Sequence, residues 1–331
     1  MKAQPSLSVI IPTYNRKKFL LDTLSSLAEQ TLPASQFEVI VVDDGSMDGT
    51  NEVQNEIFPF QLRYIRQANQ GDALARNTGV LNSQADYLVF LDDDILVAPD
   101  YLNALLEAHD HKDNRIIVGT EFLWLEEGLP GEDAISKGRV TAGEHTLVNI
   151  PYVEVCSNNM SIVRSSYLSI GMMSNLGFSG SSMWCDVDFT HRAHKKGFTF
   201  HQSLKAVCWH RDYVVRDLDT SKKRNREASY RAVVLFQKYP ELSKQLPMFA
   251  DMLPIDWRED SYKIVARKVL RFCASMPVVL FVVDKILRQV GRKGGNRPGI
   301  QFLTDWLIGG YIYWGYREGL RELTFENERL G

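Results

Sequence analysis

Short apolar runs alternate with amphipathic stretches along the first third of the chain. Continuous runs rich in β-branched residues predict buried strands at residues 7–11, 37–42, 62–66 and 87–91. Stretches with apolar residues at helical spacing, or with a helix-opening turn, predict helices at residues 17–30, 48–56, 72–82 and 99–109. Strand and helix therefore alternate four times with short links, which predicts a mostly parallel α/β sheet with helices on both faces.

The pattern changes twice further along the chain. Residues 115–199 mix short strands, glycine-rich loops and one helix near 186–196. From residue 216 onward helical spacing dominates, with helices predicted at 222–239 and 260–272. We therefore expect an α/β domain over residues 1–219, with halves of about 1–114 and 115–219, and a helical C-terminal extension over residues 220–331.

The composition is that of an ordinary globular protein and excludes collagen, disordered chains and disulfide-rich mini-proteins. Of 331 residues, 44% are hydrophobic and 24% are charged. The formal charge of −3 hides an asymmetry, because residues 1–210 hold 16 basic and 26 acidic side chains whereas residues 211–331 hold 22 basic and 15 acidic ones. An acidic body with a basic tail indicates two tasks on one chain.

The cysteines and the N-terminus favour a cytoplasmic location. The four cysteines are widely spaced and form no Cys-x-x-Cys pair, which disfavours a structural zinc site or a disulfide framework and suits a reducing compartment. The first residues lack a secretory pattern. Since no stretch reaches about 18 apolar residues without a charge, we expect no membrane-spanning helix.

Polar residues follow three of the predicted strands, at Pro12–Asn15, Asp43–Asp44 and Asp92–Asp94. Ligands of a parallel sheet bind beyond the carboxyl ends of its strands. Asp92 and Asp94 can hold a hard divalent cation, which in turn takes phosphate oxygens. Asp44 can accept hydrogen bonds from a base or a ribose. Aspartates beside glycine or serine also form turns, and this alternative stays open.

Arg76 lies in the segment Gly71–Gly79, which matches neither a Lys-Ser phosphate loop nor the dinucleotide pattern GxGxxG. A single arginine on a helix is often a solvated charge. Beside three aspartates it can instead neutralise a carboxylate or a pyrophosphate.

Four motifs in order carry a family resemblance. SVIIPTYNR, EVIVVDDGSMDGT, NQGDALARNTG and YLVFLDDD closely resemble the successive N-terminal motifs of family 2 glycosyltransferases with the GT-A fold. The resemblance extends from Leu7 to about His210. It implies a nucleotide-binding sheet of the GT-A type and an inverting transfer of a sugar from a nucleotide diphosphate donor to an acceptor hydroxyl.

The resemblance assigns roles to the residues at the strand ends. It implies that Pro12, Thr13, Tyr14 and Asn15 line the nucleobase and ribose pocket, that Asp44 binds the base or ribose, and that Arg76 approaches the base or diphosphate. Asp92, Asp93 and Asp94 correspond to the DxD motif of the donor site, with Asp94 in direct metal contact and Asp92 toward ribose and metal. His210, at the end of Val207–His210, resembles a metal-binding histidine of many relatives. The implied cofactor is Mn²⁺ or Mg²⁺.

The acceptor side has one motif and one departure from it. Trp184–Phe189 resembles the family's Glu-Asp-x-Asp/Glu-Leu pattern, in which Asp186 matches the catalytic base. Cys185 stands where the family usually has glutamate, which leaves Asp188 as a rival base. A further alternative is that both aspartates only cap a helix. The loop 177–182 is expected near donor and acceptor, and the segment 157–160 beside the sugar pocket.

The tail combines basic and apolar residues. Residues 258–297 hold ten basic and three acidic side chains around the apolar run Phe272–Val283, and a second apolar and aromatic stretch covers Ile300–Tyr316. Such a pattern is typical of a segment lying on an anionic membrane surface. Packing on the catalytic domain and a homo-oligomer interface are the alternatives. No nucleic-acid motif accompanies the charges, so nucleic acid is not expected as a partner.

The sequence thus predicts an inverting, metal-dependent glycosyltransferase at the inner face of the cell membrane, acting in polysaccharide or glycolipid synthesis. The expected donor is a nucleotide sugar, with UDP as the commoner carrier in the family, and the acceptor is a sugar or a lipid-linked sugar. Two rivals remain: a catalytically inactive scaffold with the same fold, and a nucleotidyltransferase. The latter is disfavoured because Pro12–Asn15 stands where a Gly- and Lys/Arg-rich signature is expected.

Overall fold

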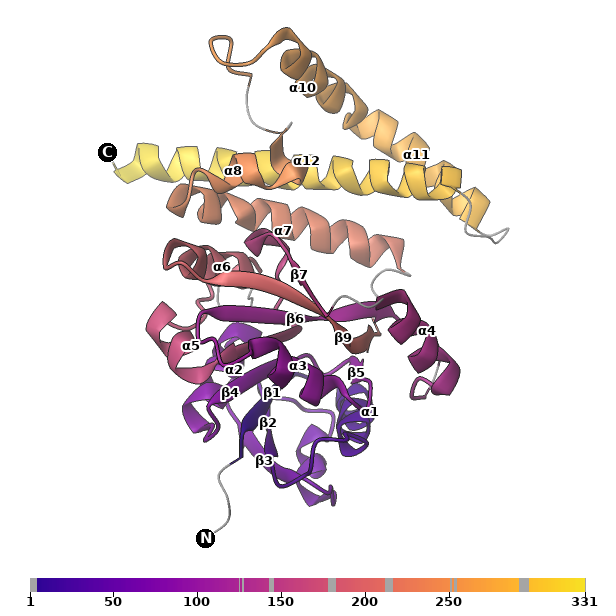
Figure 1. Ribbon diagram of the computed structural model, residues 1–331. Coiled ribbons are helices and arrows are strands. Elements are labelled where there is room, and N and C mark those ends of the chain that lie inside the picture. Colours follow the sequence, from indigo (N-terminus) through magenta and orange to yellow (C-terminus); the bar gives the residue numbers. More distant parts are fainter. Residues whose placement is uncertain are drawn as a thin grey trace. The chain divides into compact units, whose positions relative to one another are not determined.

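The structure is a computed structural model, and it describes residues 5–124, 126, 128–142, 146–177, 183–211, 217–250, 252, 255–291 and 298–330. The chain divides into two compact units, Met1–Asp212 and Tyr213–Gly331. The first unit is built around a β-sheet and the second from helices (Figure 1).

The first unit begins with the predicted strand–helix alternation. Its elements are β1 (Leu7–Thr13), α1 (Lys17–Ala28), β2 (Phe37–Asp43), η1 (Thr50–Asn55), β3 (Gln61–Arg66), α2 (Asp72–Asn82), β4 (Tyr87–Leu91), β5 (Ile95–Val97) and α3 (Tyr101–His109). The later elements are β6 (Arg115–Leu123), α4 (Glu132–Ala142), β7 (Leu147–Asn149), η2 (Tyr152–Glu154), β8 (Asn159–Val163), α5 (Arg164–Ile170), α6 (Cys185–Lys195) and β9 (Thr199–His210).

One sheet joins these strands in the order β3-β2-β1-β4-β8-β6-β9-β5, with β7 paired to β9. The strands β3, β2, β1 and β4 are parallel, which confirms the predicted α/β class. The strand β8 runs antiparallel to both β4 and β6, and β9 runs parallel to β6. The register of β1 with β2 sets Thr13 beside Asp43, so the polar residues that follow these strands meet at one edge.

Helices cover both faces of this sheet, as predicted. Successive residues of β1 point to opposite faces, and Val9 and Ile11 pack in a cluster with α1 and α3. Ile10 points the other way into a second cluster, which it shares with α2, α5 and α6. Because both faces are covered, every residue of β1 and β2 is buried, which explains their continuous apolar runs.

One predicted helix has a different geometry. Residues 48–56 were expected to form an α-helix, but η1 is a short 3₁₀ helix over Thr50–Asn55. The carboxylate of Asp48 accepts a hydrogen bond from the amide of Thr50 at 3.1 Å, and Gly49 has a φ of 83°. The side chain thus binds the backbone locally, in competition with an α-helical turn.

The second unit contains α7 (Leu218–Lys238), α8 (Leu242–Gln245), α9 (Pro247–Ala250), α10 (Tyr262–Ala274), α11 (Pro277–Gly291) and α12 (Pro298–Leu330). The helices α7 and α12 run side by side (Figure 1). Glycines allow their close approach, because a Cβ at Gly315 would lie 2.1 Å from the carbonyl oxygen of Arg226. Leu280 and Leu287 of α11 pack with Leu307 of α12 in the core of this unit.

The structure corrects one expectation about the tail. The stretch Ile300–Tyr316 was expected as part of an interfacial segment, but most of it packs inside the helical unit. Leu307 is fully buried and Tyr316 is 2% exposed. The indole of Trp306 donates a hydrogen bond to the carbonyl of Ala274 at 3.0 Å. No helix in the described ranges is both long and apolar enough to cross a bilayer.

Candidate active site

A cavity of about 250 Å³ opens at the carboxyl ends of β1, β2 and β4. Its walls are formed by Pro12, Thr13, Tyr14, Arg16, Asp44, Asp72, Asp92 and Asp93. Six of these are predicted donor-site residues, and the parallel register brings them together from three strands. Arg16 and Asp72 are additions that come from the starts of α1 and α2.

Arg76 is a buried cation rather than a solvated one. It is 2% exposed, and its guanidinium contacts Asp72 Oδ2 at 2.7 Å and Asp92 Oδ1 at 2.5 Å. Burial would lower its pKa, but the charges of Asp92, Asp72 and Asp186 keep that pKa well above the ordinary value. Conversely, burial raises the pKa of Asp92 to about 6, against the opposing effect of Arg76. The helix α2 therefore presents a fixed positive charge to Asp92.

Arg16 is a second cation at the aspartates. Its guanidinium lies 2.5 Å from Asp94 Oδ2 and 3.3 Å from Asp93 Oδ1. The hydroxyl of Thr13 donates a hydrogen bond to Asp93 Oδ2 at 2.7 Å. Burial nevertheless raises the pKa of Asp93 to about 7. Asp93 is thereby held in the wall of the cavity, where its protonation state is sensitive to a bound charge.

His210 lies beside Asp94 because β9 pairs antiparallel with β5, the strand that follows Asp92–Asp94. Its Nε2 is 3.4 Å from Asp94 Oδ1, and its Nδ1 is 3.0 Å from Glu121 Oε1. Burial would lower the pKa of His210, but these two carboxylates raise it to about 10. For Asp94, burial favours a higher pKa, but His210 and Arg16 outweigh it and the pKa is lowered.

The pair of Asp94 and His210 fits a divalent cation. Asp94 Oδ1 is buried and accepts no hydrogen bond within the described residues, and a carboxylate oxygen with an imidazole nitrogen is a donor set that Mn²⁺ accepts. Three or more carboxylate, imidazole or thiol groups do not converge into a complete cluster anywhere in the described part of the chain. The protein would thus supply only part of the coordination, as expected where substrate phosphates supply the rest.

Asp44 and Asn15 mainly fix loops around the cavity. The carboxylate of Asp44 accepts hydrogen bonds from the amides of Gln70 and Gly71, at 2.9 Å and 2.7 Å, and so holds the turn that precedes α2. The Asn15 side chain accepts a hydrogen bond from the amide of Met47 at 2.7 Å, which joins the loops after β1 and β2. Asp44 also lines the cavity, whereas Asn15 does not.

Asp186 lies in the first turn of α6 and faces the same charged groups. Its charge contributes to the pKa shifts of both Arg76 and Asp92. Burial raises its own pKa, against the effects of Arg76 and of hydrogen bonds from Ser157. The thiol of Cys185 is 3.5 Å from Asp186 Oδ1 and its residue is 2% exposed, so the cysteine lies in the core behind Asp186.

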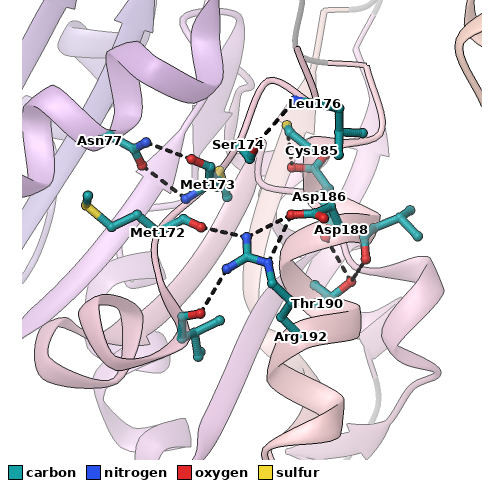
Figure 2. Close-up of polar contacts among 12 residues, drawn as sticks. Asn77, Met172, Met173, Ser174, Leu176, Cys185, Asp186, Asp188, Thr190 and Arg192 are labelled. Carbon is teal, nitrogen blue, oxygen red and sulfur yellow. Dashed lines mark hydrogen bonds and ion pairs between the residues drawn. The ribbon is translucent and has the colours of Figure 1, made fainter. Parts of the chain in front are cut away.

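Asp188 is occupied by an ion pair on its own helix (Figure 2). It is fully buried, and its Oδ2 accepts hydrogen bonds from Arg192 Nε at 3.0 Å and Nη2 at 2.8 Å. The same guanidinium donates to the carbonyls of Ile170 and Met172. Asp188 therefore anchors α6 to the segment that follows α5.

Glu121 was not predicted as a site residue from the sequence, although it contacts three side chains of the candidate site. Besides His210, it accepts hydrogen bonds from the side-chain amides of Asn158 at 2.6 Å and Asn159 at 2.9 Å. The segment 157–160 is therefore tied through Glu121 to His210. No local motif marks Glu121, although Arg16 and Asp72 could have been noticed as charges directly flanking predicted motifs. Of the predicted loop 177–182, residues 178–182 lie outside the described part.

A parallel half-sheet with an aspartate triplet at its edge, joined to antiparallel strands that return a histidine beside it, defines a fold of the GT-A type. Residues 8–152 match the family described as Glycosyl transferase family 2. This part of the first unit is thus similar to that family.

Curated relatives carry glycosyltransferase names. The validoxylamine A glucosyltransferase of Streptomyces hygroscopicus subsp. jinggangensis (strain 5008) is 28% identical over 278 residues, which are 73% of this chain and 63% of the relative. The uncharacterized glycosyltransferase YfnE of Bacillus subtilis (strain 168) is 39% identical over 115 residues, 34% of this chain and 29% of the relative. The chain thus spans less than two thirds of these relatives.

Solved structures share the fold. The mannosyltransferase PcManGT from Pyrobaculum calidifontis, in complex with GDP-Man and Mn²⁺, aligns with a TM-score of 0.60 at 16% identity, over 96% of this chain and 88% of that one. S. aureus TarS 1-349 in complex with UDP aligns with a TM-score of 0.51 at 17% identity, over 95% and 92%.

Proposed function

We propose that this protein is an inverting glycosyltransferase that moves a sugar from a nucleotide diphosphate donor to an acceptor hydroxyl. The observation that carries the proposal is the convergence of Asp72, Asp92 and Asp186 on the buried cation Arg76. A general base thereby shares a crevice with groups suited to a diphosphate. An inactive scaffold has no need for a base with a raised pKa in this place.

Asp186 is the proposed general base. It takes the proton of the acceptor hydroxyl as that oxygen attacks the anomeric carbon, while the bond from that carbon to the diphosphate breaks. One base and one displacement give inversion at the anomeric carbon. The raised pKa makes the carboxylate a stronger proton acceptor than an exposed aspartate. Asp188 is unsuited to this role because its side chain is fully buried and its carboxylate forms an ion pair with Arg192.

The leaving diphosphate meets positive charge at the same edge of the sheet. Asp94, His210 and Asp92 are the proposed holders of Mn²⁺ or Mg²⁺, which would supply electrostatic stabilisation of the charge that grows on the diphosphate. Arg76 and Arg16 add fixed positive charge. Thr13, Tyr14, Pro12 and Asp44 line the cavity proposed for the base and ribose, and Asp93 closes its wall.

For the acceptor and the cellular location, we propose only a general class. A sugar or a lipid-linked sugar in a surface polysaccharide or glycolipid fits a cytoplasmic enzyme that works at the inner face of a membrane. The Streptomyces relative is named validoxylamine A glucosyltransferase, so an acceptor screen must also include compounds other than polysaccharides and glycolipids. UDP and GDP are the donor carriers to test first, because the two solved relatives hold UDP and GDP-Man.

The test separates donor binding from transfer. Asp186→Asn is expected to keep the thermal stabilisation given by a nucleotide with Mn²⁺, but to lower transfer by at least a hundredfold, since general-base catalysis contributes about 10²- to 10⁴-fold. Transfer is measured as nucleotide diphosphate release with an acceptor panel. The exposed Asp133 of α4 provides the matched control, and Asp133→Asn should leave both readouts unchanged.

Asp188→Asn discriminates between the two aspartates. It breaks a buried ion pair, so it should lower the melting temperature before it affects the chemistry. Full transfer activity in Asp186→Asn, or a stable Asp188→Asn protein that binds donor but does not transfer, would reassign the base. A wild-type protein that binds nucleotide but transfers to no acceptor in the panel would favour the scaffold reading.

A further inference from the structure

The outward face of the helix pair α10 and α11 is apolar and exposed. On α10 the exposed side chains recur at helical spacing, and on α11 they continue beyond the turn at Ser275–Met276; they are Tyr262, Val269, Leu270, Phe272, Val278, Phe281, Val282 and Ile286. Leu270 is 69% exposed and Val278 is 73% exposed. We call these residues the α10–α11 row. The two helices follow one another along the same side of α12 (Figure 1).

The buried core of the helical unit is formed by residues outside this row. The opposite side of α11 supplies Leu280, Val283 and Leu287 to the core. On α10, two basic residues make contacts inside the unit: Lys268 pairs with Asp260 at 2.5 Å, and Arg271 donates to the carbonyl of Gly309. Lys263 and Arg267 stay exposed, so α10 presents both an apolar face and positive charge to a partner outside its own unit.

The charges around the row specify the chemistry of that partner. The helix α10 has no acidic residue, and its exposed basic residues are Lys263 and Arg267. Residues 258–297 as a whole hold ten basic and three acidic side chains. On α11 the ammonium of Lys285 lies 4.6 Å from the ring centre of Phe281, within the row itself. A partner must therefore accept apolar side chains and offer negative charge beside them.

An anionic lipid bilayer meets both demands. Apolar side chains enter the boundary between headgroups and acyl chains, while lysines and arginines reach lipid phosphates. A second copy of this chain fits less well, because a symmetric contact would set the same positive charges against each other. Nucleic acid offers phosphates but does not bury a row of valine, leucine and phenylalanine side chains.

We propose that the α10–α11 row docks this protein peripherally on a membrane that carries anionic lipid. The docking helices are α10 and the outer side of α11, while Ile300–Tyr316 belongs to the core of the unit. The proposal rests on the proposed function for its purpose, which is access to an acceptor at a membrane. The binding itself requires neither donor nor acceptor.

The experiment is co-sedimentation of the full chain with vesicles. We expect strong binding to vesicles of phosphatidylcholine and phosphatidylglycerol in equal parts, weak binding to pure phosphatidylcholine, and loss of binding as salt rises. Leu270→Glu should lower the partition coefficient at least tenfold. Ile57→Glu, at a side chain 97% exposed in the first unit, is the matched control and should bind as the wild type does.

A second pair of variants tests the charges. Replacing Lys263 and Lys285 by glutamine should weaken binding to the anionic vesicles by roughly fivefold for each lysine and leave the weak binding to neutral vesicles unchanged. All variants change exposed residues, and unchanged melting temperatures will verify their folding. Since no nucleotide sugar is present, failure of the proposed function leaves this result interpretable.

Two outcomes would overturn the proposal. One is that Leu270→Glu and the wild type bind the vesicles to the same extent, which includes the case in which neither binds. The other is a wild-type dimer in light scattering that Leu270→Glu dissociates without any change in vesicle binding. The second outcome would assign the row to contact between copies of the chain.

Discussion

Glu121 holds three side chains of the candidate site at once. One carboxylate oxygen faces His210 Nδ1 at 3.0 Å, and the other accepts hydrogen bonds from Asn158 and Asn159. Because the Glu121 oxygen accepts at Nδ1, the imidazole keeps a proton on Nδ1. The other ring nitrogen, Nε2, is the one that faces Asp94. Partners of this kind orient metal-binding histidines and set their basicity.

Glu121→Ala is therefore expected to weaken Mn²⁺ binding by about ten- to a hundredfold, as loss of such partners generally does. Glu121→Gln keeps an oxygen acceptor for His210 and should fall between the wild type and Glu121→Ala. Free Mn²⁺ measured by electron paramagnetic resonance gives the affinity without any need for turnover. Glu107→Ala, at an exposed glutamate of α3, is the control. Equal Mn²⁺ affinity in Glu121→Ala and the wild type would reduce Glu121 to a structural role.

His109 is a buried base outside the site, and it makes the stability of the first unit depend on pH. It is fully buried at the end of α3, where its Nε2 lies 2.8 Å from Ser161 Oγ and its ring packs against Tyr87. Burial, with a smaller effect of the Arg115 charge, lowers its pKa from 6.5 to about 4. Between these pH values the unfolded chain binds a proton that the folded chain does not, so stability falls as pH drops from 6.5 toward 4.

At pH 5 this linkage costs about 2 kcal/mol of unfolding free energy relative to pH 7.5. His109→Gln should remove that part of the pH dependence, although it also lowers stability at pH 7.5. Urea denaturation of both proteins at the two pH values measures the difference. The same loss of stability between pH 7.5 and pH 5 in both proteins would show that His109 is not its source.

At the level of single residues, the sequence indicated function where a motif was local and failed where a contact was distant. Asp92, Asp93 and Thr13 stand in short motifs that end strands, so their meeting in one cavity follows from a parallel sheet. Glu121 has no such mark, because its partners His210 and Asn158 lie 89 and 37 positions away. The role of Asp188 was open, although Arg192 four positions later offered the spacing of a helical ion pair.

At the level of elements, the periodic first third was predictable and the middle was not. Runs such as Phe37–Asp43 are buried on both faces, and this gives them a pattern that a sequence displays directly. Along the strand β9 (Thr199–His210), buried and exposed residues follow one another without a regular period of two. Its register with β6 also shifts between Gly119 and Thr120. Such a strand depends on its pairing partners β5, β6 and β7, which come from separate parts of the chain.

The helices of the tail show the same limit in another form. The amphipathic pattern of α10 was visible, but only the packing shows which side is buried. The aromatic residues of α12 resembled an interfacial segment in composition, yet their indole nitrogens donate to the carbonyls of Ala274 and Ser275 inside the unit. The composition thus showed that both helices combine apolar or aromatic residues with polar ones. Only the contacts in the structure show which of these residues are buried.

At the level of the whole molecule, the charge asymmetry coincides with the division into two units. The acidic residues that matter for the site belong to Met1–Asp212, and the basic stretch belongs to Tyr213–Gly331. The first unit has its own apolar clusters on both faces of the sheet, and its candidate site draws on no residue after Arg211 among those described. Such a unit has the contacts that independent folding requires.

A chain that ends at Asp212 is therefore expected to fold and to keep nucleotide binding while losing membrane binding. The cut belongs at this position rather than near 219, because the side chain of Asp217 caps α7 and a later cut leaves that cap without its helix. Thermal stabilisation by UDP or GDP with Mn²⁺ should match that of the full chain within a factor of about three in affinity, since a change under 1 kcal/mol is expected for a site with no distant contacts. Co-sedimentation with anionic vesicles should disappear. If the shortened protein folds, shown by a cooperative melting transition, yet no longer responds to nucleotide, then the helical unit contributes to the donor site and the two tasks are not separable.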